Sequence, residues 1–371
     1  MKSFTLTSGT LTGSGSLEAI TTTVDSATIA TPIADAPGQT SDFVKTGSGT
    51  TTVTAANTFT GTLDIQDGTV TIGSGGSFAA ASSLSLASGA TLDLGGTTQA
   101  FAALNGAGGT VDVSSGALSV SGASSFAGVI SGTGSFTKSG TGDLVLSGTN
   151  TYDGGTTISG GRLSVNGALG NTPVSVTGGT LGGSGSIAGT VAVANGGTLA
   201  PGNSIDVFAT GAASFTSGSI FDYEVDSSDL SVSSLGTAAD LLVVTGDVTI
   251  TPGTVLNFAD LNASPQAFVE DTTIFAMINY TGSLAGTFRY NGTALADGSR
   301  FTVGSQMWEI DYDYAYTGSN IQPLNYSADF LPASDTQTFV TVTAVPEPST
   351  YVMLAIAGGI AAVAARRRRK A

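Results

Sequence analysis

Residues 136–165, FTKSGTGDLVLSGTNTYDGGTTISGGRLSV, decide the fold of this chain, because diluted copies of the stretch recur before and after it. It contains three short runs typical of β-strands, each bounded by Gly, Asn, Asp or Ser residues that favour turns. The runs are Leu144–Leu146, Thr156–Ile158 and Leu163–Val165. The stretch carries no catalytic motif, so we interpret it as a scaffold.

One copy lies 93 positions upstream without a gap. Its matching residues are Phe43, Lys45, Gly47, Gly49, Asn57, Thr58, Gly61, Ile65 and Gly68. A finer period separates glycines that precede short apolar runs. Gly68, Gly89 and Gly109 lie 21 and 20 positions apart, and Gly161, Gly179 and Gly197 lie 18 and 18 positions apart. A period of about 20 that holds only strands and turns predicts a solenoid with one β-coil per repeat.

The segment GTNTYDGGTTISGGRL, residues 148–163, resembles the autotransporter-associated β-strand repeat of bacterial surface proteins. Residues 178–204 and 238–250 resemble the downstream part of such passenger regions. The likeness covers residues 43–250 and implies an all-β fold, a right-handed parallel β-helix. At about 20 residues per coil we expect roughly ten coils, and at about 4.8 Å per coil a shaft roughly 50 Å long.

The composition excludes several classes of function. The chain has 371 residues with no Cys and no His, which removes thiolate nucleophiles, imidazole bases, Ser-His-Asp triads and ordinary zinc sites. Five of the 11 basic residues lie at the C-terminus, which leaves six basic against 27 acidic residues upstream. Nucleic acid is therefore not an expected partner.

The regions that flank the repeats differ in composition. Residues 1–42 hold repeat-like material, because Thr10–Leu17 echoes Thr180–Ile187, followed by a linker with Pro32 and Pro37. We therefore expect the chain to begin within repeat material, without a signal-peptide core. Residues 251–344 are richer in aromatic residues, and we predict a separate β-rich cap that covers the open end of the solenoid.

Residues 345–371 combine a Pro-Glu-Pro element, an apolar span and a basic cluster. The element is Pro346, Glu347 and Pro348, and the span runs from Tyr351 to Ala365 without a charge. The cluster consists of Arg366, Arg367, Arg368, Arg369 and Lys370. We predict a short transmembrane helix with its C-terminal end in the cytoplasm.

This order of features resembles the PEP-CTERM sorting signal of Gram-negative bacteria. The resemblance implies that Pro346, Glu347 and Pro348 are recognised by exosortase, a membrane enzyme that removes the tail. It implies an inner-membrane precursor, followed by a mature protein at the cell surface or outside the cell.

Two acidic strands are candidates for chemistry. Asp222, Glu224, Asp226 and Asp229 alternate with apolar residues, as do Glu309, Asp311 and Asp313 within the predicted strand 308–316. Either set could bind calcium or supply paired carboxylates, and either could be the solvated face of one strand. The aromatic residues opposite the second set, Trp308 included, are a sugar-stacking platform or the core of the cap. Arg162, Arg289 and Arg300 are candidate bases or residues of exposed turns.

The sequence favours a non-catalytic exported protein that acts as a structural or adhesive element and associates with exopolysaccharide. We predict no catalytic, cofactor or metal residue, with calcium as the one ion that the acids could hold. The alternative is a β-helical polysaccharide lyase or hydrolase, which needs acids and a base gathered in one groove.

Overall fold

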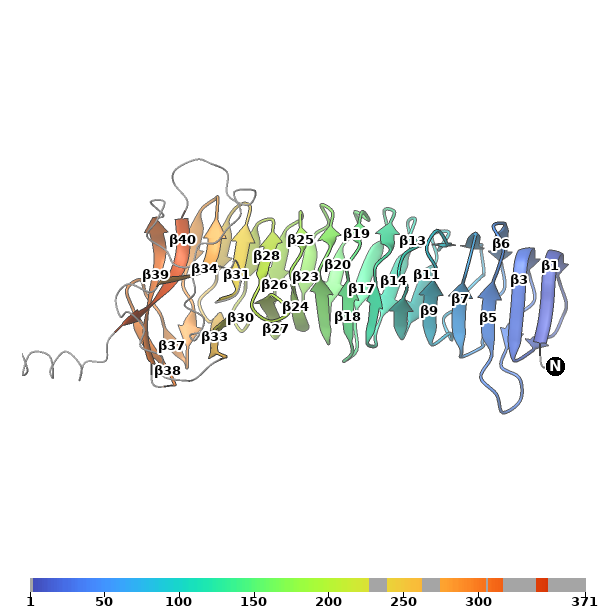
Figure 1. Ribbon diagram of the computed structural model, residues 1–371, viewed down its shortest axis with the longest axis horizontal. Helices are drawn as coiled ribbons and strands as arrows, with labels where there is room; N and C mark the ends of the chain where they lie inside the picture. The colour runs from blue at the N-terminus through green and yellow to red at the C-terminus, as the bar shows by residue number, and fades with distance from the viewer. Residues whose placement is uncertain (1–2, 227–238, 262–273, 305, 316–337, 346–371) are drawn as a thin grey trace, which may run out of the picture.

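The computed structural model describes residues 3–226, 239–261, 274–304, 306–315 and 338–345. Within these ranges every regular element is a β-strand, and the strands stack as a solenoid along the long axis of the molecule (Figure 1). The three runs predicted in residues 136–165 are confirmed by β18, β20 and β21. The C-terminal sorting features, from Pro346 onward, lie outside the described residues.

The coils form three faces, which we call the shaft. The strands of face one are β5 (Asp42–Lys45), β7 (Thr62–Ile65), β9 (Ser83–Leu86), β12 (Ala103–Asn105), β15 (Ser124–Phe126), β18 (Asp143–Leu146), β21 (Arg162–Val165), β24 (Gly179–Gly183), β27 (Gly197–Pro201), β30 (Ile220–Val225), β33 (Val255–Asp260) and β36 (Arg289–Tyr290). The strands of face two are β6 (Thr50–Val53), β8 (Thr69–Ile72), β10 (Thr91–Asp93), β13 (Thr110–Asp112), β16 (Val129–Ser131), β19 (Thr149–Asn150), β22 (Ala168–Leu169), β25 (Ser186–Ile187), β28 (Val207–Thr210), β31 (Leu241–Val244) and β34 (Ile274–Tyr280). Face three holds β11 (Thr98–Phe101), β14 (Ala117–Val120), β17 (Ser135–Lys138), β20 (Thr156–Ile158), β23 (Val174–Val176), β26 (Val191–Val193), β29 (Ala213–Phe215), β32 (Val248–Ile250) and β35 (Leu284–Gly286).

Residues 3–34 add strands to this stack, whereas the sequence predicted a linker around Pro32 and Pro37. β1 (Ser3–Leu11) pairs in parallel with β3 (Thr21–Ile29), and β2 (Leu17–Glu18) pairs with β4 (Ile33–Ala34). β3 is long enough to pair with β5 at one end and β6 at the other. The buried residues of β3 are Thr22, Val24, Ala27 and Ile29, so its inward side chains continue the core despite the nearby prolines.

The C-terminal region continues the shaft before it turns into a cap. β33 pairs in parallel with β30, and β35 with β32, as in the preceding coils. Pairing then becomes antiparallel in β37 (Thr293–Ala294), β38 (Arg300–Val303), β39 (Gln306–Ala315) and β40 (Thr338–Val345). β40 lies between β34 and β39, so its two edges are both paired. Phe258 of β33 and Trp308 of β39 are in ring contact at 5.0 Å, so one core runs through shaft and cap.

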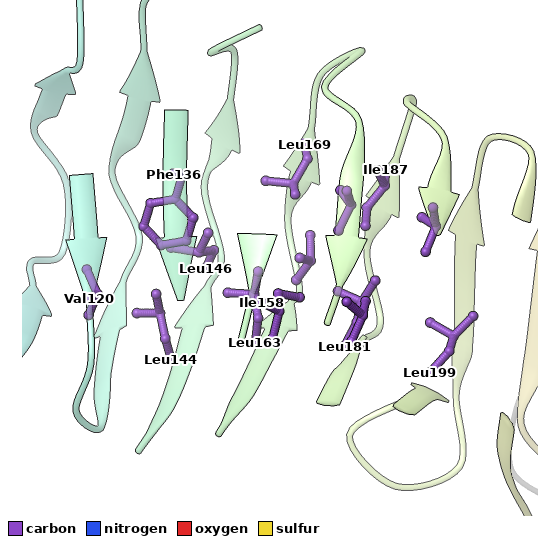
Figure 2. Close-up of a cluster of buried hydrophobic side chains, with 14 of the residues drawn as sticks. Val120, Phe136, Leu144, Leu146, Ile158, Leu163, Leu169, Leu181, Ile187 and Leu199 are labelled. Carbon is purple, nitrogen blue, oxygen red and sulfur yellow. The ribbon is translucent and has the colours of Figure 1, made fainter. Parts of the chain in front are cut away.

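The core of the shaft is a set of ladders built from equivalent residues of successive coils. Leu144, Leu163, Leu181 and Leu199 pair in register on face one, and all four are fully buried (Figure 2). Each buried Leu contributes about 2 kcal/mol of apolar transfer free energy. Because the strands alternate inward and outward residues, the period of two in the sequence is enough to build this core.

Buried polar side chains fasten one coil to the next at the positions shared by the two long repeats. Asn150 accepts a hydrogen bond from the Ile130 amide at 2.9 Å and donates to the carbonyl oxygens of Gly148 and Ala168. Lys138 Nζ donates to the Ser139 carbonyl oxygen at 2.5 Å and lies 3.4 Å from that of Gly160.

The upstream copy repeats the arrangement. Asn57 bonds the Ile33 amide and the carbonyl oxygens of Ala55 and Ser77, and Lys45 Nζ bonds those of Thr46, Gly47 and Asp67. Lys45 also lies 3.7 Å from Asp25. Burial lowers the pKa of both lysines, and for Lys45 the Asp25 carboxylate opposes that shift.

Candidate functional site at an enlarged corner of the shaft

The corner between face one and face two is enlarged in three consecutive coils. In a regular coil two residues separate the faces, since β21 ends at Val165 and β22 begins at Ala168. β27 ends at Pro201 and β28 begins at Val207, and the next two coils have longer connections still, after Val225 and after Asp260. Insertions in a solenoid often lie on its binding face, so this enlarged corner is the leading candidate for a binding site.

The acids of β30 lie beside this corner. Phe221, Tyr223 and Val225 point inward and are fully buried, whereas Asp222 and Glu224 are half-buried on the outer side. The alternation predicted from the sequence is therefore confirmed. Asp226 follows the strand, and Asp229 lies outside the described residues.

Asp222 and Glu224 line a small cavity together with a side chain from three coils earlier. The walls are Arg162, residues 200–204, Asp222, Glu224 and Asp240, and we call this cavity the corner pocket. It encloses about 80 Å³, well below the 300–1,000 Å³ typical of pockets that enclose a drug-sized ligand. It therefore has room for a single functional group, and not for a whole sugar ring.

Asp240 forms the buried floor of the corner pocket, with 1% of its surface exposed. One carboxyl oxygen accepts a hydrogen bond from the Asp206 amide at 3.2 Å, and the other accepts from the Glu224 amide at 3.1 Å. Burial raises the pKa of Asp240 to about 8, with the Glu224 and Asp222 carboxylates adding to the shift and the two amides opposing it. At neutral pH this carboxyl group is therefore largely protonated.

Arg162 spans the corner pocket from the side of β21. Its Nη2 donates to the Gly202 carbonyl oxygen at 2.6 Å, and its Nε donates to the Ser164 hydroxyl oxygen at 3.1 Å. Burial and the neighbouring Asp222 raise the pKa of Glu224, and the charge of Arg162 opposes that rise. The structure thus gathers Arg162, Asp222 and Glu224, which the sequence could offer only as separate candidates.

The other two candidate arginines lie elsewhere. Arg289 donates to the Gly292 carbonyl oxygen at an exposed turn, and Arg300 forms an ion pair with Glu309 at 2.7 Å. Neither residue lines the corner pocket.

The second acidic set, which includes Asp311 and Asp313, lies in the cap. The structure places a further acid beside it, Asp297, which the sequence did not indicate. Carboxylate oxygens of Asp297, Asp311 and Asp313 lie within 4.8 Å of one another. Asp297 accepts a hydrogen bond from the Tyr312 amide, and burial raises the pKa of Asp311, with Asp297 and Asp313 adding to it. Three carboxylates at this spacing match the ligands that Ca²⁺ takes, although exposed acids commonly gather without an ion.

Trp308 is not available as a sugar-stacking platform. It is fully buried, and its ring contacts Phe258 and Phe275 at centroid distances of 5.0 and 5.7 Å. Tyr312 is also buried, and its hydroxyl oxygen accepts a hydrogen bond from the Phe288 amide at 2.9 Å. The interpretation of these aromatic residues as the core of the cap is correct, because both rings are buried against aromatic residues of the last coils.

Comparison with known proteins identifies the repeats. The family model Passenger-associated-transport-repeat matches residues 43–72 and 136–165. The chain carries two passenger-associated transport repeats. The structure places them in β5–β8 and β17–β21, where the buried lysine and asparagine of each repeat fasten neighbouring coils.

A second family model, the PEP-CTERM protein-sorting motif, matches residues 344–369. Both resemblances noted in the sequence are thereby confirmed. The match begins at Ala344, so the sorting motif overlaps the last two residues of β40, the last described strand of the cap. Among the described residues, no helix has the length and apolar character needed to cross a bilayer.

Part of the chain is similar to an autotransporter adhesin. The adhesin BmaC autotransporter of Brucella suis biovar 1 (strain 1330) is 32% identical over 133 residues. The match covers 36% of this chain and 4% of the adhesin.

Proposed function

We propose that this chain is an exported surface protein of a Gram-negative-type bacterium, whose right-handed solenoid serves as a non-catalytic structural or adhesive shaft. The observation that carries the proposal is the order of parts along one chain. Passenger repeats build the shaft, a paired strand closes its C-terminal end, and a sorting motif begins within that strand. The adhesin match supports the adhesive part.

The proposal assigns a role to each part of the tail. Residues Tyr351–Ala365 cross the inner membrane of the precursor, and the cluster Arg366–Lys370 holds the C-terminus in the cytoplasm. Exosortase recognises Pro346, Glu347 and Pro348 and removes the tail, which leaves the shaft and cap at the cell surface or outside the cell.

Processing is tested by mass spectrometry of the protein from cell-surface and membrane fractions. Wild-type surface material is expected to lack Arg366–Lys370, and replacement of Pro346, Glu347 and Pro348 by Ala should leave the intact precursor in the inner membrane. Surface material that retains the basic cluster would contradict processing.

Exopolysaccharide is the proposed partner of the displayed shaft. Six basic residues against 26 acidic ones in residues 1–344 give the displayed protein a strongly negative charge. This charge suits a neutral glycan, or an acidic glycan bridged by calcium, better than an acidic glycan alone. Retention of the purified protein on exopolysaccharide, with calcium and with chelator, separates these two modes.

Polysaccharide cleavage remains the second candidate function, and the corner pocket is the observation that favours it. A carboxyl group with a raised pKa lies beside two further carboxylates and an arginine, which are residue types that glycan-cleaving enzymes use. Release of reducing ends or unsaturated sugars from exopolysaccharide by the wild type, and not by Asp240→Asn, would establish it.

A further inference from the structure

The corner pocket is built at the point where the solenoid departs from its period. Partners on face one differ in residue number by 18 between β24 and β27, by 22 between β27 and β30, and by 35 between β30 and β33. The extra length of the first enlarged step forms the loop 202–206. That loop is held against the shaft by Asp240 through the Asp206 amide and by Arg162 through the Gly202 carbonyl oxygen.

Charged ligands fit this cavity poorly. Among the described acids, those that place three carboxylate oxygens within 4.8 Å of one another are Asp297, Asp311 and Asp313, and not the acids of the corner pocket. The guanidinium group of Arg162 would also repel a divalent cation. Anions such as phosphate or a uronate would meet the Asp222 and Glu224 carboxylates.

A neutral ligand with hydroxyl groups fits the hydrogen-bonding groups that line the corner pocket. The Glu224 carboxylate can accept hydrogen bonds from two adjacent hydroxyl groups, and the second terminal nitrogen of Arg162 can donate to a hydroxyl oxygen. Asp240 is mostly protonated at neutral pH, and each of its oxygens accepts one amide, so its proton can be donated into the cavity. The exposed side chains of Asn203 and Ser204 at the rim add further polar partners.

We propose that the corner pocket is a subsite for the hydroxyl edge of one neutral sugar residue, held by Glu224, Arg162 and Asp240. At about 80 Å³ the cavity admits the hydroxyl groups while the ring stays at the mouth. The affinity of one such contact lies in the millimolar range, and repeated copies of the sugar along a polymer raise the overall retention. This inference deepens the adhesive part of the proposed function and rests on it.

The test is saturation-transfer NMR of the purified full-length chain with methyl glycosides. The neutral probes are those of glucose, mannose, galactose and N-acetylglucosamine, and the charged probes are methyl glucuronide and glucosamine. We expect saturation of at least one neutral probe and at least a tenfold weaker binding in Glu224→Ala. That variant keeps the backbone amide that donates to Asp240, so the floor of the cavity remains in place.

Two further variants separate binding from folding. Ser204→Tyr should block the mouth of the cavity from an exposed loop position, and Asp153→Ala removes an exposed acid that does not line the cavity and should leave binding unchanged. Three outcomes would overturn the inference. Folded protein could transfer saturation to the charged probes alone, or to no probe, or the neutral probes could be saturated equally by the wild type and by Glu224→Ala. The proposed export and processing are measured on cells, so either result can fail without the other.

Discussion

Lys138 and Asn150 are matched by Lys45 and Asn57 in the upstream repeat, and the structure gives the physical reason for the match. Each side chain is buried and satisfies backbone groups of a neighbouring coil. The sequence revealed the correspondence but not the role, because the bonded groups lie a whole coil away and no local pattern identifies them. A buried amide or ammonium group with every bond made fixes the register between coils.

Replacement of Asn150 by Ala should lower the free energy of unfolding by about 3 kcal/mol, because the Ile130 amide and two carbonyl groups lose a buried partner. The exposed strand residue Asn105 provides the control, since Asn105→Ala removes the same side chain from a solvated position. Urea unfolding followed by circular dichroism measures both. Equal midpoints for the two variants would show that the buried amide does not fasten the coils.

Asp240 makes the stability of the enlarged corner depend on pH. Its pKa of about 8 in the folded protein exceeds the ordinary value of 3.8, so the folded state binds the proton more tightly than the unfolded state. Its contribution to stability is complete below pH 4 and is lost as the pH rises through 8, with a slope that approaches about 1.4 kcal/mol per pH unit. Asp240→Asn should therefore gain stability relative to wild type between pH 5.5 and pH 7.5. Parallel pH curves in urea unfolding would contradict the raised pKa.

Sequence reasoning found part of the corner pocket. Asp222, Glu224 and Arg162 were each recognisable, because acids that alternate with aromatic residues must face outward and an arginine is rare in this chain. Asp240 was missed, since it joins the others only when a long connection returns to the coil. The lengthening of the glycine period after Gly197 was the available signal.

At the scale of elements, the strands were predictable and the limits of the solenoid were not. Alternation gave β18, β20, β21 and β39 directly, because one side of each strand must be apolar. The shaft extends into residues 3–34. There, threonines occupy many positions of the strands, and two prolines follow nearby, so the sequence shows no clear alternation of apolar and polar residues. The cap was expected to be separate, yet its aromatic residues pack into the core of the last coils. Composition does not reveal these contacts, because they join residues that are far apart in the sequence.

Turns between faces depend on glycine for two separable reasons, and one pair of variants distinguishes them. Gly161 and Gly89 both have positive φ angles, 62° and 86°. A Cβ atom at Gly161 would collide with the Gly142 carbonyl oxygen of the preceding coil and lie 2.8 Å from Lys138 Nζ, whereas one at Gly89 would meet nothing within 4 Å.

Gly89→Ala should therefore cost about 1 kcal/mol for the backbone conformation alone, and Gly161→Ala should cost at least twice as much. Thermal unfolding followed by circular dichroism gives the comparison. A Gly89→Ala variant as unstable as Gly161→Ala would show that contact between coils adds nothing to the backbone cost.

At the scale of the whole molecule, regular stacking makes distances along the shaft predictable. Thr198 of β27 lies one coil beyond Thr180 of β24, with which it is paired, and the two should differ by about 4.8 Å in their distance from Thr62 of β7. The chain contains no Cys, so spin labels can be attached at Thr62→Cys with Thr180→Cys or Thr198→Cys without background. Pulsed electron paramagnetic resonance should return mean distances of roughly 29 and 34 Å. Equal distances for the two pairs would contradict the one-coil spacing.

The parallel pairing of the shaft also determines how it responds to mechanical load. Hydrogen bonds between coils run along the long axis, so tension between the two ends pulls each strand away from its neighbour and breaks bonds a few at a time (Figure 1). The mechanical work is then absorbed in many small extensions, and each extension releases the length of chain that forms a single coil. β40 pairs with β34 over six residues and with β39 over seven, whereas β22 pairs with β25 over two and β21 with β24 over three. More hydrogen bonds must therefore break together at the end next to the sorting motif than in the middle of the shaft. A solenoid of this design lengthens gradually under tension, and the end next to the sorting motif stays folded longest.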